Sequence, residues 1–231
     1  FMIPMLMMNA NVLEASRQAG IKGLIFTSSI GAYPDREILD ETMAFDGEPM
    51  DYYPGWAKRT AELQIKTYQI QYGIDNFIPC RLSTVYGEGD NFDPDNAMVI
   101  PSLMAKIKRG DNPVVIWGDG SAIRDFAYSG DIAKGLLLAM EHGHDLFNLG
   151  SGSGVSIKEL VQTLCSIVHF NYSWDATKPS GQSKRILNID MARLLLNYNP
   201  ETSLKDGLRK TWDWYCEHEK ETKSRQNYFK G

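Results

Sequence analysis

The chain has 231 residues, of which 43% are hydrophobic and 23% are charged. This composition supplies enough apolar material for a packed core and too little charge for an intrinsically disordered protein. The 24 basic and 29 acidic residues give a net charge of -5 without a block of like charge, so we expect no nucleic-acid partner. The apolar runs fall short of the roughly 18 residues that a membrane helix needs, so we expect no membrane partner either.

The cysteines and histidines give no sign of a structural cross-link. Cys80, Cys165 and Cys216 are odd in number and far apart in the sequence. This spacing argues against a disulfide framework and favours a reducing compartment, so we expect a cytoplasmic protein. The pair His142-x-His144 stands without a cluster of cysteines or carboxylates, and we therefore predict no metal site.

The first eighty-odd residues alternate between helical and extended patterns. Apolar spacing predicts helices over 5–19 and about 54–72, and strands at 24–26 and 76–82. Gly20 and Gly73 stand where left-handed caps would end the two helices. This alternation is typical of a parallel sheet that is covered by helices.

After Gly87 the pattern loosens into a loop rich in Asp, Asn and Pro. Further elements are predicted at 101–108 (helix), 114–117 (strand), 131–141 (helix) and 147–149 (strand). A helix is expected from Ser156, which has capping-box spacing with Glu159, and a last helix follows the similar pair Ser203 and Asp206.

Hydroxyl side chains, Thr27-Ser28-Ser29, end the first predicted strand. The carboxyl end of a parallel strand is where ligands bind in open α/β sheets. Lys58 and the tyrosines Tyr52 and Tyr53 follow, and an ammonium group lowers the pKa of a nearby phenol by stabilising the phenolate. Such a set can move a proton to or from a sugar hydroxyl while a nicotinamide moves a hydride. The alternative interpretation is a strand end with serine caps and a surface lysine.

Four segments in order resemble the extended short-chain dehydrogenase/reductase family: Phe26 to Pro34, Gly55 to Lys58, Arg81 to Gly87, and Trp117 to Phe126. Within that family the chain is similar to the NAD-dependent epimerase/dehydratase group and to GDP-L-fucose synthases, with which it shares 90–94 and 99–101. The resemblance implies an α/β fold in which a Rossmann-like parallel sheet has helices on both faces. It assigns residues 1–87 to the cofactor domain and 88–231 mainly to a smaller α/β substrate lobe, with some segments returning to the Rossmann sheet.

The resemblance also implies a role for each matching residue. Ser29 takes the place of the catalytic Ser/Thr, and Lys58 takes that of the catalytic lysine, which also binds the nicotinamide ribose of NAD or NADP. The other cofactor-binding positions are Thr27, Ser28, Leu82 and Val85. A nucleotide-sugar substrate is expected at Thr84, Asn91, Val99, Trp117 and Arg124. A guanidinium group such as that of Arg124 suits the oxygens of a diphosphate.

One departure from the family concerns the catalytic tyrosine. The family pattern is Tyr-x-x-x-Lys, but Pro54 stands four residues before Lys58 and Tyr53 stands five before it. Helical positions i and i+5 are roughly 140° apart. If Pro54 is the first helical residue, Tyr53 lies in the irregular backbone ahead of it, and its hydroxyl can reach the site. Tyr53 is therefore our candidate.

Two more departures concern proton transfer and the cofactor loop. Gly31 and Met98 stand where fucose synthases have a cysteine and a histidine as acid and base, which argues against the fucose synthase reaction itself. The strand, glycine-rich turn and helix that hold a dinucleotide's diphosphate do not precede Leu24. We therefore expect that an N-terminal segment is missing.

The sequence thus predicts an NAD(P)-dependent enzyme that epimerises, reduces or dehydrates a nucleotide-linked hexose. The alternative is a nucleotide-sugar binding or assembly subunit that keeps the fold and has lost the tyrosine. By resemblance to the family's four-helix interface, either protein is expected to form a homodimer through the helices 5–19 and 54–72.

Overall fold

A three-stranded parallel sheet forms one end of the protein, in a computed structural model that describes residues 2–93 and 96–224. Its strands, in spatial order, are β1 (Leu24–Ser29), β3 (Phe77–Leu82) and β8 (Phe147–Leu149). Ser29 is aligned with Leu82, and Leu82 with Leu149, so the carboxyl ends of the three strands lie side by side. Phe1, residues 94–95, which include Pro94 of the shared segment 90–94, and residues 225–231 lie outside the described residues.

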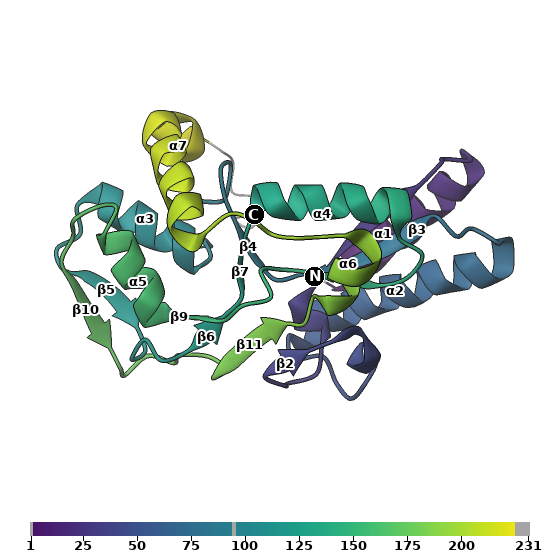
Figure 1. Cartoon of the computed structure of the whole chain (residues 1–231), viewed down its shortest axis with the longest axis horizontal. Helices are drawn as coiled ribbons and strands as arrows, with labels where there is room; N and C mark the ends of the chain where they lie inside the picture. The colour runs from purple at the N-terminus through teal and green to yellow at the C-terminus, as the bar shows by residue number, and fades with distance from the viewer. Residues whose placement is uncertain (1, 94–95, 225–231) are drawn as a thin grey trace.

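Helices cover both faces of this sheet (Figure 1). On one face lie α1 (Met2–Gln18) and α2 (Tyr52–Tyr72), whose Leu13 and Ile65 pack with Phe77 of β3. On the other face lie α4 (Ser129–His142) and α6 (Asp190–Leu196), which share a larger core cluster with Ile78 of β3. Phe77 and Ile78 point to opposite faces, as a strand that is buried on both sides requires. The predicted α/β class with a Rossmann-like parallel sheet is confirmed.

A second core cluster lies at the other end of the molecule (Figure 1). It is built by α3 (Val99–Arg109), α5 (Ile157–Cys165), α7 (Leu204–Ser224) and the parallel pair β5 (Val114–Trp117) and β10 (Tyr172–Asp175). Because β8 and α4 follow residue 87 and yet pack on the first sheet, the chain returns to that sheet after its first visit to the second cluster. The division at residue 87 stays a prediction.

Short strands connect the two ends. A four-stranded sheet has the order β2 (Ile38–Leu39), β11 (Lys184–Leu187), β6 (Ile123–Arg124) and β9 (Val155–Ser156). A parallel pair joins β4 (Thr84–Tyr86) to β7 (Phe126–Tyr128). The 3-10 helices η1 (Ile30–Ala32) and η2 (Glu41–Met43) follow β1 and β2. No helix among the described residues is long and apolar enough to span a bilayer.

The start of α2 differs from the sequence prediction. The helix begins at Tyr52, so Tyr53 and Pro54 both lie inside its first turn, and Tyr53 is not in irregular backbone ahead of the helix. A helix tolerates proline there because the amides of its first turn have no partner within the helix. The far end agrees with the prediction, since the cap Gly73 has a φ of 65°.

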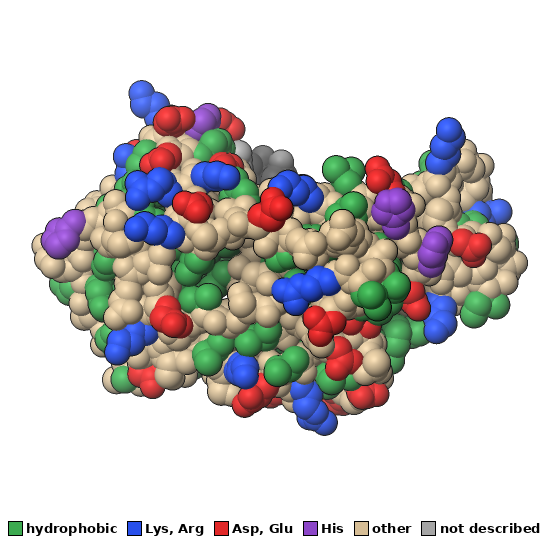
Figure 2. Space-filling model, in the orientation of Figure 1, with side chains coloured by type: hydrophobic (Ala, Val, Ile, Leu, Met, Phe, Trp, Pro, Cys, Tyr) green, Lys and Arg blue, Asp and Glu red, His purple; other side chains and the backbone are tan. Residues whose placement is uncertain are grey.

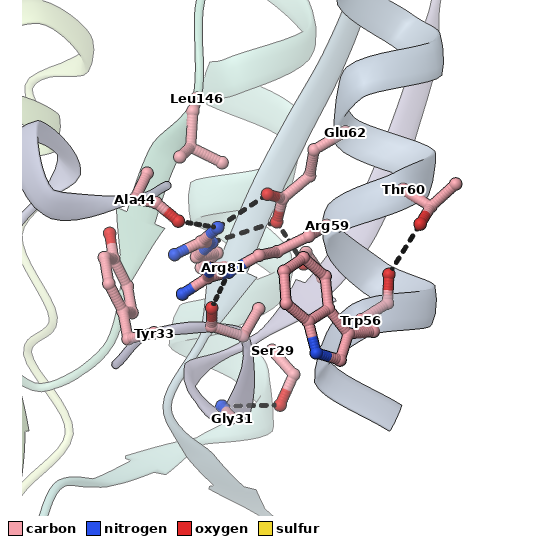
Figure 3. Close-up of polar contacts among 12 residues, drawn as sticks. Ser29, Gly31, Tyr33, Ala44, Trp56, Arg59, Thr60, Glu62, Arg81 and Leu146 are labelled. Carbon is pink, nitrogen blue, oxygen red and sulfur yellow. Dashed lines mark hydrogen bonds and ion pairs between the residues drawn. The ribbon is translucent and has the colours of Figure 1, made fainter. Parts of the chain in front are cut away.

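A buried ion pair joins α2 to β3 (Figure 3). Arg81 donates from Nε to Oε1 of Glu62 at 2.9 Å and from Nη2 to Oε2 at 2.6 Å. Ser28 Oγ also donates to Glu62 Oε1, at 2.5 Å, and Arg81 Nη2 donates to the carbonyl of Ala44 at 2.8 Å. The Tyr33 ring centre lies 4.1 Å from the guanidinium carbon. Such additional partners are what a buried pair needs to offset its desolvation.

We expect Arg81→Met to lower the free energy of unfolding by about 3–5 kcal/mol, because it leaves the Glu62 carboxylate buried without a cation. Urea denaturation followed by circular dichroism measures the loss. The matched control is Arg109→Met, which breaks the Arg109–Asp111 pair, where the arginine side chain is 58% exposed. Exposed pairs contribute at most about 1 kcal/mol. Equal losses in the two variants would contradict the assigned role of the buried pair.

Candidate active site

Lys58 lies beside the carboxyl end of β1. Its Nζ donates to the carbonyl of Thr27 at 2.7 Å and lies 4.9 Å from the centre of the Phe26 ring. Burial lowers the pKa of this ammonium group, and the nearby Glu62 carboxylate partly offsets the shift. Glu62 stands one helical turn after Lys58, so the two side chains leave the same face of α2. The ion pair of Glu62 with Arg81 therefore also orients Lys58 toward the sheet.

The three hydroxyl residues at the end of β1 have different surroundings. Ser29 is half-buried, and its Oγ accepts a hydrogen bond from the Gly31 amide at 3.1 Å. Ser28 is buried on the opposite side of the strand, where its hydroxyl is bonded to Glu62. Thr27 is exposed and provides the carbonyl that Lys58 binds. The structure therefore brings Ser29 and Lys58 to the same strand end, while the hydroxyl of Ser28 serves the core.

Leu82, Thr84 and Val85 follow the neighbouring strand end. Leu82 is half-buried and is the register partner of Ser29. Thr84 and Val85 are half-buried on β4, and the Thr84 amide donates to the carbonyl of Asp125 at 3.0 Å. Ser83, between the two strands, is buried, and its Oγ has no hydrogen-bond partner in the described part of the chain. These residues occupy the edge at which open α/β sheets bind ligands.

Arg124 lies on β6 beside Arg185, its register partner on β11. Burial lowers the pKa of Arg124, and the neighbouring Arg185 lowers it further. The Arg124 guanidinium donates to the carbonyls of Ile123 at 2.7 Å and of Ser180 at 3.5 Å. Two adjacent guanidinium groups favour an anionic ligand. At the end of β5, Trp117 is 60% exposed, and Lys178 Nζ lies 5.8 Å from its ring centre.

Tyr53, Asn91 and Val99 are predicted site residues whose contacts involve neither Ser29 nor Lys58 among the described interactions. Tyr53 is 65% exposed, and its ring packs edge-on against Tyr52 at 5.0 Å. Because Tyr53 lies in the helix five residues before Lys58, the two side chains leave α2 about 140° apart. Asn91 is exposed, with its Oδ1 bonded to the amide of Asp93 at 3.0 Å. Val99 is half-buried at the start of α3 and packs on the second core cluster.

Sequence reasoning missed Asp51 and Arg185. Arg185 Nη2 lies 3.2 Å from Oδ1 of Asp51, across a sequence separation of 134 residues. No local spacing relates two residues so far apart, and neither belongs to the four family landmarks. Arg185 lies on β11, which pairs with β2, and Asp51 is the residue directly before α2. Over the face that Figure 2 shows, Lys and Arg side chains are interspersed with Asp and Glu.

The described residues fit one half of a nicotinamide dinucleotide. Lys58 Nζ uses one hydrogen bond on Thr27, and an ammonium group has three donors, so it can also bind ribose hydroxyls. Among the described residues, a glycine-rich turn between a strand and a helix does not precede β1, so the donors for the diphosphate half are not part of this set.

Known proteins resemble this chain in sequence and in fold. Residues 4–150 match the model of the NAD dependent epimerase/dehydratase family. The chain is 34% identical over 227 residues to a protein named Putative GDP-L-fucose synthase 2 from Arabidopsis thaliana. The matched region covers 92% of this chain and 68% of that relative. The chain belongs to the NAD-dependent epimerase/dehydratase family. The resemblance inferred from four sequence landmarks is thereby confirmed.

Two solved structures show the same fold with ligands. A GDP-L-fucose synthetase from Naegleria fowleri bound to NADP has a TM-score of 0.86 and 25% identity, over 95% of this chain and 74% of that one. A UDP-glucose 4-epimerase with UDP-glucose from Thermotoga maritima has a TM-score of 0.78 and 30% identity, over 90% and 68% of the two chains. The expectation of NAD or NADP as the cofactor is confirmed at the level of the family.

The pKa of the Lys58 ammonium group is expected to lie below 10.5, the ordinary value for lysine, because burial disfavours its charged form. In the pH range between the folded pKa and 10.5, the unfolded chain binds more protons than the folded protein, so the free energy of unfolding rises with pH. NMR titration of the reductively methylated protein measures this pKa, and Lys58→Met identifies the signal. A Lys58 signal that titrates at or above the ordinary value would contradict the prediction.

Proposed function

We propose that this protein is an NAD(P)-dependent enzyme that epimerises, reduces or dehydrates a nucleotide-linked hexose. The supporting observation is the hydrogen bond between Lys58 and Thr27, at the strand end that Ser29 completes. In this proposal Ser29 donates a hydrogen bond to the reacting sugar oxygen, and Lys58 binds the nicotinamide ribose beside Leu82 and Val85. When bound, NAD(P) supplies the hydride chemistry.

The substrate's diphosphate is proposed to lie on Arg124. Its guanidinium group has carbonyl partners and a second arginine beside it, so an anion would relieve the repulsion between two like charges. Trp117 exposes a ring that can flank a base, and Thr84, Asn91 and Val99 complete the proposed substrate contacts. The similar proteins, which include a UDP-glucose 4-epimerase with UDP-glucose, support a nucleoside diphosphate sugar as the substrate class.

Ser29→Ala and Lys58→Met are each expected to lower turnover by about 10²–10⁴-fold, because each removes a group from the proton and cofactor chemistry. Tyr53→Phe tests the tyrosine candidate in the same assay, which follows NAD(P)H absorbance with GDP-linked and UDP-linked hexoses. Ser166→Ala, at the exposed end of α5, is the control. The proposal fails if the complete protein binds neither NAD(P)H nor a nucleotide sugar by calorimetry.

We also propose a homodimer through α1 and α2. These helices pack on each other through Leu13 and Ile65, and they expose further apolar side chains: Ile3, Met7, Met8 and Val12 on α1, and Leu63 and Ile70 on α2. Spacings of four residues between Ile3 and Met7, and seven between Leu63 and Ile70, form apolar stripes. A second copy that presents the same helices would bury these stripes in a two-fold interface.

The double variant Met7→Glu/Ile70→Glu is expected to shift the mass from two copies to one, since it places charges in the apolar interface. Light scattering after size-exclusion chromatography measures the mass. Leu194→Glu is the matched control, because Leu194 is also an exposed leucine, at 83%, but lies on α6. A wild-type protein with the mass of one copy would contradict the proposed dimer.

The cytoplasm is the compartment that we propose. All three cysteines are free thiols. Burial raises the pKa of the Cys80 thiol to about 12, so this thiol is unreactive at neutral pH. Free thiols persist in reducing compartments, which supports the proposed location.

A further inference from the structure

Asp51 occupies the N-cap position of α2 but does not cap the helix. An aspartate at this position usually accepts a hydrogen bond from an amide of the first turn. The side chain of Asp51 makes no such bond. It turns instead toward Gly31, where an added Cβ would lie 2.1 Å from Asp51 Oδ2. A carboxylate therefore fills the space that a side chain at position 31 would need.

This space adjoins Ser29. The Gly31 amide donates to Ser29 Oγ at 3.1 Å, and the Gly31 carbonyl accepts from the Asp51 amide at 3.1 Å. Gly31 is thus bonded on one side to the proposed sugar-binding hydroxyl and on the other to the backbone of Asp51. Figure 3 shows the hydrogen bond between Ser29, the last residue of β1, and Gly31 in the turn that follows. The carboxylate of Asp51 accordingly lies in the neighbourhood of the proposed reaction.

Arg185 holds the other oxygen of this carboxylate. Its Nη2 lies 3.2 Å from Asp51 Oδ1, and the Asp51 side chain is 43% exposed, so a ligand can approach it. Arg185 is also the register partner of Arg124, the proposed diphosphate ligand. Asp51 and Arg185 therefore span the region between Ser29 and Arg124. A hexose whose diphosphate lies on Arg124 and whose reacting carbon lies near Ser29 occupies this same region.

We propose that Asp51 transfers a proton at a carbon of the bound sugar, and that Arg185 is its positioning residue. The inference rests on the proposed function and assigns the proton transfer that Gly31 and Met98 cannot perform. In a ketosugar, the C–H bond next to the carbonyl breaks, and Asp51 Oδ2 takes the proton. The electron pair forms a carbon–carbon double bond, and the negative charge moves to the former ketone oxygen beside Ser29.

Return of a proton to the same carbon completes the step. If Asp51 returns a proton, it arrives on the face from which the first proton left, and the configuration is kept. If a water molecule on the opposite face supplies the proton, the carbon is inverted, and the proton held by Asp51 passes through solvent to the hydroxide that is left, which restores the carboxylate. Electrons are neither gained nor lost overall, so this exchange needs no oxidant or reductant. It can therefore be measured without turnover of NAD(P), as uptake of deuterium from D₂O into the sugar.

The test measures deuterium uptake into GDP-linked and UDP-linked 4-keto-6-deoxyhexoses by mass spectrometry, using the complete protein. Asp51→Asn is expected to lower the exchange rate by about 10²–10⁴-fold. Its dissociation constant for the nucleotide sugar, from calorimetry, should stay within about threefold of wild type. The matched control is Glu37→Gln, because Glu37 pairs at 3.6 Å with Lys184, the neighbour of Arg185 on β11. This control should exchange like the wild type.

The possible outcomes separate this inference from the proposed function. Exchange by Asp51→Asn at the wild-type rate overturns the inference, and so does a loss of binding as large as the loss of exchange, since Asp51 would then only recognise the sugar. A wild-type protein that binds the ketosugar but exchanges no carbon-bound proton also overturns it while leaving the proposed function intact. A wild-type protein that binds no nucleotide sugar instead refutes the proposed function.

Arg185 is tested by conservative rescue. Arg185→Gln is expected to lower exchange by at least about tenfold, whereas Arg185→Lys should recover most of the rate because a cation again holds Asp51 Oδ1. The thermal midpoints of both variants show whether the fold is kept. Wild-type exchange by Arg185→Gln would remove Arg185 from the proposal.

Discussion

The carboxylate of Glu62 joins helix α2 to the two strands whose ends form the site. It accepts hydrogen bonds from Ser28 of β1 and from Arg81 of β3, and all three side chains are buried. A buried carboxylate without these partners would cost several kcal/mol, so the helix has little freedom to slide or rotate on the sheet. Lys58 stands one turn earlier on the same helix. The hydrogen bond between Lys58 and Thr27 is thus a consequence of a core ion pair.

A second buried cation fixes the backbone around the site. Arg59 donates to the carbonyls of Ala32 at 2.5 Å, Gly47 at 2.6 Å and Asp46 at 2.9 Å. Ala32 belongs to η1, directly after Gly31, and the loop at 46–47 leads to Asp51 at the start of α2. Two consecutive residues of α2 therefore contact different segments. Lys58 donates to the carbonyl of Thr27 at the end of β1. Arg59 binds the carbonyls of Ala32, next to Gly31, and of the loop 46–47, which precedes Asp51.

Sequence patterns predicted the parts of the structure that repeat. Most of the helices were predicted because their apolar residues recur at regular spacing, but helix α6 and strand β11 were not predicted. The capping box at Ser156 was predicted because both partners lie within one turn, and it is confirmed by the bond from the Glu159 amide to Ser156 Oγ at 3.1 Å. Ser29 and Lys58 were chosen as candidate site residues because a strand end and a family landmark coincide, and the structure places both at the end of β1. The two-residue strands β2, β6 and β9 are too short to show a period.

What the sequence could not supply are contacts between distant charged residues. The sequence does not show that Arg81 and Glu62 form a buried pair, because charged residues are almost never fully buried unless they are paired, and pairing depends on the tertiary fold. The same holds for Asp51 and Arg185, which meet across 134 residues. The start of α2 was predicted wrongly for a local reason, since proline is accepted at several positions of a first turn and does not mark one of them.

The sequence and the structure lead to different conclusions about Gly31, because the structure shows the Asp51 carboxylate in the space beside it. In the sequence, a glycine at this position argues against proton transfer, because it removes a side chain that the family uses. In the structure, an added Cβ at position 31 would lie 2.1 Å from Asp51 Oδ2 and 2.9 Å from Asp51 Cβ, so a larger residue at position 31 requires the Asp51 side chain to move away. The glycine is therefore the condition under which a carboxylate from the start of α2 reaches the neighbourhood of Ser29. For the proposed proton transfer, the residues at positions 31 and 51 must therefore be considered together, because the glycine at 31 does not by itself exclude an acid or base beside Ser29.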